Sequence, residues 1–185
     1  MSIKSIKKGA ILVARPSLNI DIFNRSVILI TETHENGTVG FIINRSLEVP
    51  MRLLAKDLPI EDMVYEGGPV DKENIYYIHQ RPDLIRNSLP IAKNLFWSGN
   101  FEDVERHMKS GEITSKEIKF FLGYTGWAKN QLETEIEKYN EWDILPEHSI
   151  DIFRPHDHQL WKSVMKKLGG DNLIWLNTPL DPSLN

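Results

Sequence analysis

The sequence predicts an α+β protein with a mixed sheet that forms a single domain over residues 1–185. Three observations favour this class. Short apolar runs rich in β-branched residues end at Gly, Pro or Asn, as strands do. Other segments repeat apolar residues at helical spacing. Two of the strands adjoin through a hairpin signal, and the regular strand–helix alternation of a parallel sheet is missing.

The strands are expected first in the N-terminal third of the chain. "RSVILITE" and "TVGFIIN" are predicted to pair as a hairpin, in which Asn36-Gly37 supplies the positive φ angles of a tight turn. "MVYEGGPV" is predicted to be a strand that runs into a double-glycine turn. The expected strands cover residues 9–14, 25–32, 38–44, 63–70, 74–80, 94–99 and 117–123.

About four helices are expected to flank this sheet. Asn100 is a good N-cap and Gly111 a stop for the second of them. The four helices are expected over residues 51–57, 101–110, 128–139 and 157–168. The third is expected to present one apolar stripe, made of Ala128, Leu132, Ile136 and Tyr139.

Composition limits the possible functions. The chain has no cysteine, which excludes disulfides, thiolate zinc sites and thiol nucleophiles and suits a reducing compartment. The apolar run before Arg15 is too short for a signal peptide, and no run approaches the roughly 20 residues of a membrane span. We therefore expect a cytoplasmic protein without membrane contact. The formal net charge of -4 disfavours DNA as a partner.

The stretch "FFLGYTGWAKNQLETEI", residues 120–136, places two glycines between an apolar run and a charged helix. A loop at a helix N-terminus can bind anions, but the spacing here matches neither nucleotide-binding glycine motif. The bulky Tyr124 and Trp127 also stand at positions where such a loop has small residues, which let the ligand approach the backbone. We interpret "GYTGW" as a structural hinge from loop to helix, with Trp127 as a packing anchor.

Metal and catalytic motifs give no further assignment. The His156-Asp157-His158 cluster falls at a helix start, without the partners of a zinc site. The nucleophile motif G-x-S-x-G is absent. The sequence therefore predicts no catalytic residues, no metal ligands and no cofactor.

Several stretches occur in a characteristic order: "ILVARPSLNIDIFNRSVILI", "NGTVGFIINR", "GGPV", "IYYIH" and "LGYTGW" with "QLETEI". The chain closes with Trp142, Phe153, Trp161 and Gly169. Through these stretches the chain resembles the AlgH/YqgE family of small bacterial proteins over nearly its full length. Mild departures from the family pattern stand at Ser46, Thr125 and Asn130, and they concern loop geometry.

The resemblance implies a compact α+β fold whose sheet is bifurcated and curls towards a pseudo-barrel. It attaches no firm enzymatic activity to the chain. Some members are labelled transcriptional regulators because of effects on polysaccharide production. Kinship of fold does not settle function.

Polar and aromatic residues beside the predicted turns form a candidate binding site. If they converge, they would line a cleft rimmed by arginine and aromatic side chains, which suits recognition of a protein or a small ligand. We therefore expect a non-enzymatic binding or regulatory module whose protein or small-ligand partner is unknown. The candidate residues are Arg25, Asn44, Arg45, Gly67, Gly68, His79, Tyr124, Trp127 and Gln131.

Three alternatives stay open. Tyr124 and Trp127 would instead pack the core, while Asn44 and Gln131 satisfy loop backbone. A hydrolase-like enzyme would use His79 or Tyr124 as its acid–base group, which requires a serine or carboxylate within hydrogen-bond reach of His79. A DNA-binding regulator would need a continuous basic face and an affinity that falls steeply with salt.

Overall fold

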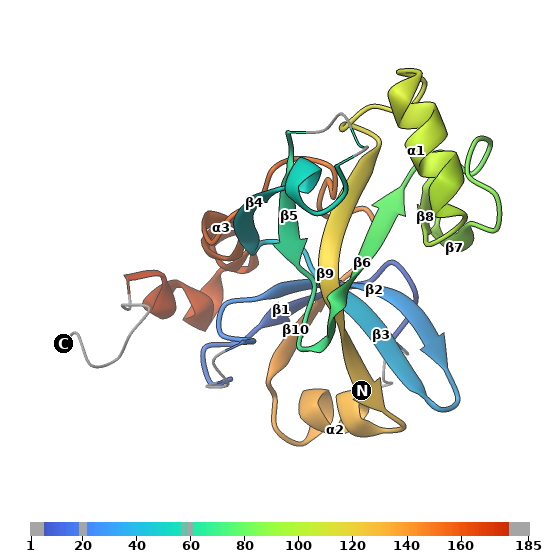
Figure 1. The fold of residues 1–185 in the computed structure, drawn as a ribbon. Coiled ribbons are helices and arrows are strands. Elements are labelled where there is room, and N and C mark those ends of the chain that lie inside the picture. The colour runs from blue at the N-terminus through green and yellow to red at the C-terminus, as the bar shows by residue number, and fades with distance from the viewer. Residues whose placement is uncertain (1–5, 19–21, 57, 59–60, 178–185) are drawn as a thin grey trace.

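The computed structural model describes residues 6–18, 22–56, 58 and 61–177 (Figure 1). Within these ranges the strands are β1 (Ile11–Ala14), β2 (Val27–His34), β3 (Gly37–Ile42), β4 (Ser46–Pro50), β5 (Met63–Glu66), β6 (Val70–His79), β7 (Leu89–Ala92), β8 (Leu95–Trp97), β9 (Ile118–Ala128) and β10 (Trp142–Leu145). The α-helices are α1 (Phe101–Lys109), α2 (Gln131–Glu137) and α3 (Gln159–Leu168), and two 3₁₀ segments are η1 (Met51–Leu53) and η2 (Gly170–Asn177).

The strands form one large sheet, antiparallel apart from a single described pair. Its strand order is β10-β1-β2-β3-β9-β6-β8-β7, and β4 joins through β5, which pairs with β9 in parallel. The α+β class is thus confirmed. The sheet does not close into a barrel, because β10 and β7 stand at opposite ends of the strand order. The expected pseudo-barrel is therefore corrected to an open sheet.

Strand β9 is where the sheet forks. One of its edges pairs with β6, while the other pairs first with β5 and then, from Thr125 onward, with β3. Gly123 lies between these two partners with φ +66°, and a Cβ there would lie 2.7 Å from the Val70 carbonyl oxygen. Only glycine fits this position without strain. Figure 1 shows β9 running through both branches of the sheet.

The "GYTGW" interpretation needs correction. These residues belong to β9, which continues to Ala128, and α2 begins only at Gln131. The extension has a tertiary cause, because the backbone of Gly37–Gly40 pairs with Thr125–Ala128. Trp127 is 5% exposed, so its role as a packing anchor is confirmed.

The predicted apolar stripe of the third helix holds only in its centre. Leu132 is fully buried and Ile136 packs against the same cluster. Ala128 belongs to β9, and Tyr139 is 53% exposed beyond the end of α2. The predicted stripe was therefore wrong at its start, where Ala128 belongs to the preceding strand.

The hairpin of β2 and β3 is confirmed, but its turn differs from the prediction. His34 pairs with Gly37, so Glu35 and Asn36 form the loop, and Asn36 has no positive φ. Gly37 does have the predicted positive φ, +153°, and it is needed for a second reason. A Cβ on it would lie 2.2 Å from the carbonyl oxygen of Trp127 on the neighbouring strand.

Helix α1 begins as predicted, because the Asn100 side chain accepts a hydrogen bond from the Asp103 N–H at 3.1 Å. The expected helix over residues 51–57 is a single 3₁₀ turn, η1, and residue 57 lies outside the described ranges. The described part of the chain therefore has three α-helices where about four were expected. No helix in the described ranges has the length and apolar character needed to cross a bilayer.

Three apolar clusters fill the two faces of the sheet. Successive residues of β9 point to opposite faces, so Phe121 joins the cluster under α3 while Phe120 joins the cluster under α1. Trp127 and Trp142 form the third cluster with α2. Lys119 shares the face of Phe121 and is the charged residue that β9 sends into the interior.

Candidate functional site

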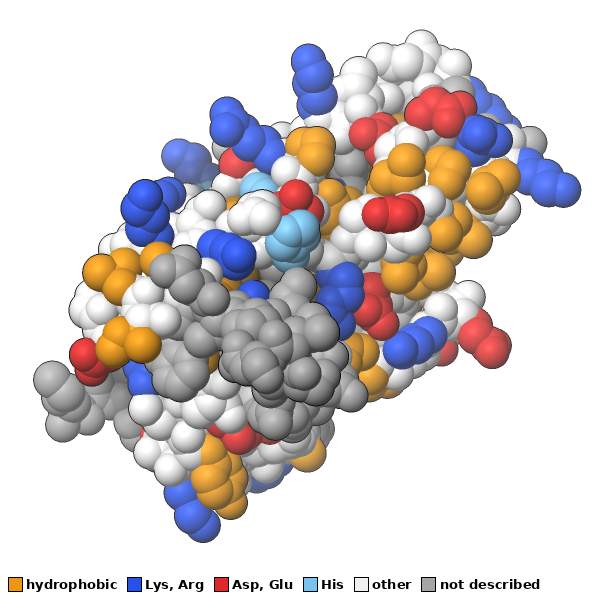
Figure 2. Space-filling view, turned by 90° about the vertical axis from the view of Figure 1, so that its left-hand side faces the viewer, with side chains coloured by type: hydrophobic (Ala, Val, Ile, Leu, Met, Phe, Trp, Pro, Cys, Tyr) orange, Lys and Arg blue, Asp and Glu red, His pale blue; other side chains and the backbone are white. Residues whose placement is uncertain are grey.

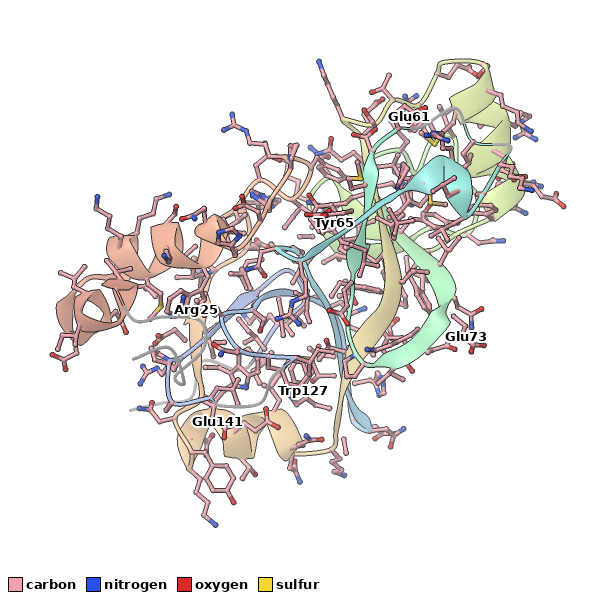
Figure 3. All side chains as sticks on the ribbon, turned by 60° about the vertical axis from the view of Figure 1, so that its left-hand side comes forward. Arg25, Glu61, Tyr65, Glu73, Trp127 and Glu141 are labelled. Atoms are coloured by element: carbon pink, nitrogen blue, oxygen red, sulfur yellow. The ribbon has the colours of Figure 1, made fainter. Side chains whose placement is uncertain are left out.

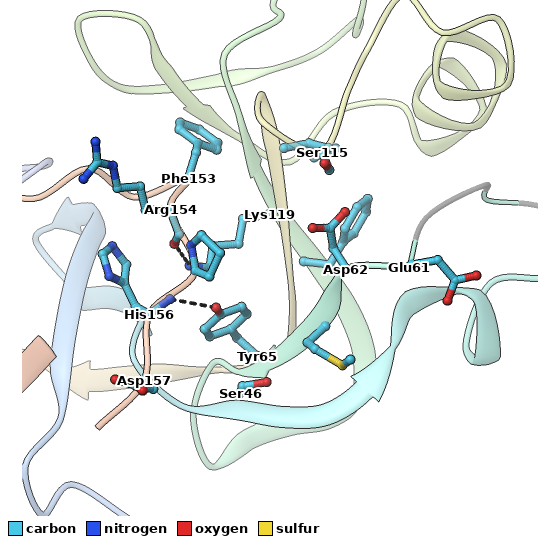
Figure 4. Close-up of a pocket in the computed structure, with 14 residues that line it drawn as sticks. Ser46, Glu61, Asp62, Tyr65, Ser115, Lys119, Phe153, Arg154, His156 and Asp157 are labelled. Carbon is cyan, nitrogen blue, oxygen red and sulfur yellow. Dashed lines mark hydrogen bonds between the residues drawn. The ribbon is translucent and has the colours of Figure 1, made fainter. Parts of the chain in front are cut away.

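A pocket of about 430 Å³ opens between β5, the start of β9 and the connection from β10 to α3 (Figure 4). We call this the main pocket, and we call the connection, residues 146–158, the strap. The strap contributes one wall through the consecutive residues 153–157. Tyr65, Lys119 and Ser46 come from the sheet, and Asp62 and Glu61 from the segment before β5.

Lys119 is the most deeply buried charged group at this pocket. Its Nζ donates hydrogen bonds to the carbonyl oxygens of Ile152 at 3.1 Å and Arg154 at 3.0 Å. The same Nζ lies 3.8 Å from the centre of the Tyr65 ring. The side chain therefore has an acceptor for each of the three hydrogens of an ammonium group. Burial lowers the pKa of Lys119 to about 7.

Tyr65 and His156 make a second link across the pocket. The Tyr65 hydroxyl accepts a hydrogen bond from the His156 N–H at 3.0 Å. The His156 imidazole Nε2 lies 2.6 Å from the carbonyl oxygen of Asp151. Burial raises the pKa of Tyr65 and lowers that of His156, so at neutral pH both rings are uncharged. Lys119 and Tyr65, which come from the sheet, are thus both hydrogen bonded to the strap.

A smaller pocket of about 260 Å³ adjoins the main pocket. Arg25, Asn44 and Arg45 line it, and Ser46 and Asp157 line both pockets. We call the two together the groove. Figure 3 shows Arg25 and Glu61 on either side of Tyr65, in agreement with this arrangement. The groove therefore carries charges of both signs, because Glu48 and Asp157 line the smaller pocket beside the arginines and Arg154 lines the main pocket.

The three predicted residues in the groove differ in their contacts. Asn44 is buried, and its amide accepts from the Val27 N–H at 2.9 Å and donates to the Arg25 carbonyl at 3.0 Å. The Arg25 guanidinium lies 5.1 Å from the Trp161 ring. Arg45 pairs with Glu66 at 3.3 Å. The Asn44 amide thus pairs with backbone groups, while Arg25 and Arg45 line the groove.

The predicted glycines have a packing role beside the fork. A Cβ on Gly67 would lie 2.2 Å from the Gly123 carbonyl oxygen, and one on Gly68 would lie 2.3 Å from that of Tyr124. These contacts mean that the turn lets two segments approach closely. The Tyr124 ring packs edge-on against Tyr76 at 5.6 Å. None of the three lines the groove.

His79 is fully buried and hydrogen bonds only to backbone. Its Nδ1 accepts from the Arg81 N–H at 3.1 Å, and its Nε2 lies 3.1 Å from the Ser98 carbonyl oxygen. Burial lowers the pKa of His79. The bonds favour the tautomer with the proton on Nε2. This arrangement is that of a structural histidine and removes His79 from the candidate acid–base groups.

Trp127 and Gln131 hold α2 against the sheet. The Trp127 indole donates to Glu135 at 2.8 Å, and Trp142 donates to the same carboxylate oxygen at 2.9 Å. The Gln131 side chain accepts from the Ala128 N–H at 3.0 Å. Of the nine predicted site residues, the structure thus brings Arg25, Asn44 and Arg45 to the groove and places the others elsewhere.

Sequence reasoning missed Tyr65, Lys119 and His156. One signal was present, because Lys119 is a lone charge inside the apolar run "IKFFLG" and alternates onto the same face as Phe121. Such a lysine is either edge-exposed or buried with acceptors. His156 was considered only as a metal ligand. Within the described ranges, no group of three or more His, Cys, Asp or Glu side chains is placed to hold a metal ion.

Comparison with known proteins agrees with the fold. Residues 11–173 match the family model described as DUF179, AlgH-like. The chain is 34% identical over 182 residues to a UPF0301 protein of Cytophaga hutchinsonii, covering 97% of this chain and 100% of the relative. It is 33% identical to a UPF0301 protein of Bacteroides thetaiotaomicron, covering 96% and 91% of the two chains.

Two solved structures share the fold at low identity. The solution structure of the AlgH protein from Pseudomonas aeruginosa has a TM-score of 0.71 at 24% identity, with 97% of each chain covered. A crystal structure from Corynebacterium diphtheriae has a TM-score of 0.73 at 23% identity, with 96% of this chain and 95% of that chain covered. The family match over residues 11–173 and the 34% identity to a full-length relative establish that the chain belongs to the AlgH-like family.

Proposed function

We propose that this protein is a non-enzymatic recognition module that binds an extended segment of a partner polypeptide in the groove. The observation that carries the proposal is the continuity of the two pockets through Ser46 and Asp157. An elongated groove suits an extended peptide better than a compact metabolite. A regulatory role through partner binding would fit the label that some family members carry.

The charges of the groove support a peptide ligand. Arg25 and Arg45 line the smaller pocket together with Glu48, and Asp62 and Glu61 line the main pocket together with Arg154. A segment that carries both an acidic and a basic residue would find a partner of opposite charge in each pocket. Figure 2 shows acidic and basic side chains interspersed on this face, a pattern that disfavours a uniform polyanion as ligand.

Apolar contacts are available beside these charges. Met63 lines the main pocket and is 44% exposed, and Leu53 is 59% exposed on the η1 turn that follows β4. An apolar side chain of the ligand between its two charged residues would bury part of this surface.

The state of the polar groups supports recognition over catalysis. Lys119 and Tyr65 are both committed to bonds with the strap. A nucleophile or base would have to break these bonds before it could react. A binding surface has no such requirement, since it needs a fixed shape.

Selection from a random peptide library on the immobilised protein tests the proposal. We expect enriched peptides that carry both charges, and Ser46→Tyr should weaken their binding by about tenfold or more by filling the junction of the two pockets. Ser110→Tyr introduces the same ring at the exposed end of α1 and should leave binding unchanged.

Fluorescence anisotropy with the selected peptides gives the affinities. Binding that is equal in the wild type and Ser46→Tyr would place the site away from the groove. A selection that enriches no peptide above a protein-free control would overturn the peptide proposal. Both variants must first show native circular dichroism.

A further inference from the structure

The strap separates three pockets. Its residue Phe153 lines the main pocket and also a pocket of about 450 Å³ bounded by Leu29 and Ala92. Its residues Arg154 and His156 line the main pocket and also a pocket of about 370 Å³ beside α3. A displacement of this one segment would therefore join spaces that are now distinct.

The strap is weakly tied to the sheet. No backbone–backbone hydrogen bond joins residues 146–158 to another part of the described chain, apart from the first turn of α3 that the strap itself starts. Three hydrogen bonds from side chains of the sheet hold it instead. Lys119 donates two of them, to the carbonyls of Ile152 and Arg154, and the Tyr65 hydroxyl accepts the third from the His156 N–H.

Contacts within the strap stiffen it as a unit. The Phe153 N–H donates to the Asp151 carboxylate at 3.1 Å, and Arg154 pairs with the same residue at 3.4 Å. His156 also returns to Asp151 through its ring. Ile152, 5% exposed, belongs to the core cluster under α3, and Ile150 and Phe153 pack against the same cluster. A segment with internal bonds and few outside attachments opens as a body rather than residue by residue.

We propose that residues 146–158 open as a unit with the Lys119 amine as their latch, and that opening joins the main pocket to the two pockets behind the strap. Opening breaks the Lys119 hydrogen bonds and withdraws Ile150, Ile152 and Phe153 from the core, so these contacts resist it, while water can bind the two freed carbonyls. The inference does not depend on what the groove binds, because it concerns the motion of its wall.

A proton is coupled to this motion. In the closed form burial lowers the pKa of Lys119 to about 7, whereas in the open form the amine is in water with a pKa of about 10.4. At pH values between these two pKa values, opening is therefore accompanied by the uptake of a proton. Each unit of rising pH then makes the equilibrium constant for opening up to about tenfold smaller. Below pH 7 the amine is protonated in both forms, so opening is independent of its titration.

Other groups face Lys119 and must be considered. Tyr65 comes from β5 and His156 from the strap, and burial keeps both uncharged through the window above pH 7. The carboxylates of Asp151 and Asp157 on the strap and of Asp62 before β5 complete the set. In the pH window above 7, Lys119 is thus the member of this set that changes charge.

Hydrogen exchange followed by mass spectrometry tests the proposal. In Lys119→Met, the strap peptide that contains the His156 amide, whose N–H donates to Tyr65, should exchange about tenfold faster or more, while the peptides of β9 keep their protection. Tyr65→Phe removes the acceptor itself and gives the exchange of this amide without its protection. Lys116→Met, an exposed lysine three residues away, is the matched control and should match the wild type.

A pH series separates a latch from a merely structural lysine. After correction for the intrinsic exchange rate, strap exchange in the wild type should slow as the pH rises from 7 to 9, and in Lys119→Met it should be flat. The wild-type series needs no variant, so a misfolded mutant does not spoil the test. Strap amides that exchange only together with β9, or a Lys119→Met rate equal to that of Lys116→Met, would overturn the proposal without affecting the peptide selection.

Discussion

Asn44 shows how a polar residue beside a turn becomes part of the scaffold. Its amide joins the carbonyl of Arg25 to the N–H of Val27, two backbone groups that the strand ladder leaves unpaired. Arg25 adopts φ +55°, in the left-handed region, and its carbonyl accepts the hydrogen bond from Asn44. A side chain of this length, with one donor and one acceptor, is required there.

Asn44→Ala should therefore destabilise the protein by about 2–4 kcal/mol, because each buried group left without a partner costs about 1–3 kcal/mol. Urea denaturation followed by circular dichroism measures the loss. Asn74→Ala removes an exposed amide that bonds only Asp71 and should change stability by less than about 0.5 kcal/mol. Equal effects of the two substitutions would refute this account.

Asp103 is a fully buried carboxylate that ties α1 to the loop before β7. Two arginines bind it, Arg86 at 2.7 and 2.9 Å and Arg106 at 2.7 Å. The side-chain hydrogen bond from Arg86, and then its N–H, hold the pKa of Asp103 well below its ordinary range. Because the folded-state pKa is depressed, this stabilisation is complete above about pH 4 and is lost as the pH falls below it.

Asp103→Asn should lower the urea midpoint of unfolding at pH 7. Between pH 7 and pH 3 the midpoint of this variant should fall by less than the midpoint of the wild type. The comparison of midpoints at the two pH values is the measurement. Glu61→Gln, whose carboxylate is 79% exposed, should follow the wild type at both. A mutant whose midpoint falls with acid as steeply as that of the wild type would contradict the assignment.

At the scale of elements, Gly123 makes the fork of β9 possible. Gly123→Ala forces a side chain into a positive φ and within 2.8 Å of two carbonyl oxygens. It should cost about 2 kcal/mol or more. Gly111→Ala is the matched control, since Gly111 also has a positive φ of +77° but nothing lies within 4 Å of its Cβ. Its cost should stay near about 1 kcal/mol, and thermal unfolding of both variants measures the difference.

The elements divide into those that local pattern determines and those that contacts determine. The hairpin and α1 follow from turn and capping residues, so the sequence predicted both. Strands β4, β7 and β10 were missed because each is only four or five residues long and pairs at the margin of the sheet. The strand character of "GYTGW" comes from β3, which is distant in sequence.

The groove could be predicted only in part for the same reason. Arg25, Asn44 and Arg45 cluster because β2 and β3 are hairpin partners, a relation that the sequence reveals. Lys119 and His156 meet because the strap returns to the sheet after β10 has paired with β1. No local signal specifies that return, since it follows from the whole topology.

At the scale of the molecule, β9 joins two branches of the sheet into one cooperative unit. Trp97 lies on β8 in one branch and Trp142 on β10 in the other. With 5-fluorotryptophan incorporated, their fluorine resonances should lose native intensity at the same urea concentration, as two-state unfolding requires. Two separate midpoints would mean that the branches unfold independently and that β9 does not couple them.

The shared strand also has a consequence for synthesis. Gly40 of β3 pairs with Thr125 of β9, which the ribosome adds 85 residues later. At about 5–20 residues per second, roughly 4–17 s pass before that partner exists. During this interval β1 and β3 are the unpaired margins of a nascent three-stranded sheet, open to pairing with other chains. Codon changes that slow translation between these positions should therefore reduce the soluble yield while leaving the finished protein identical.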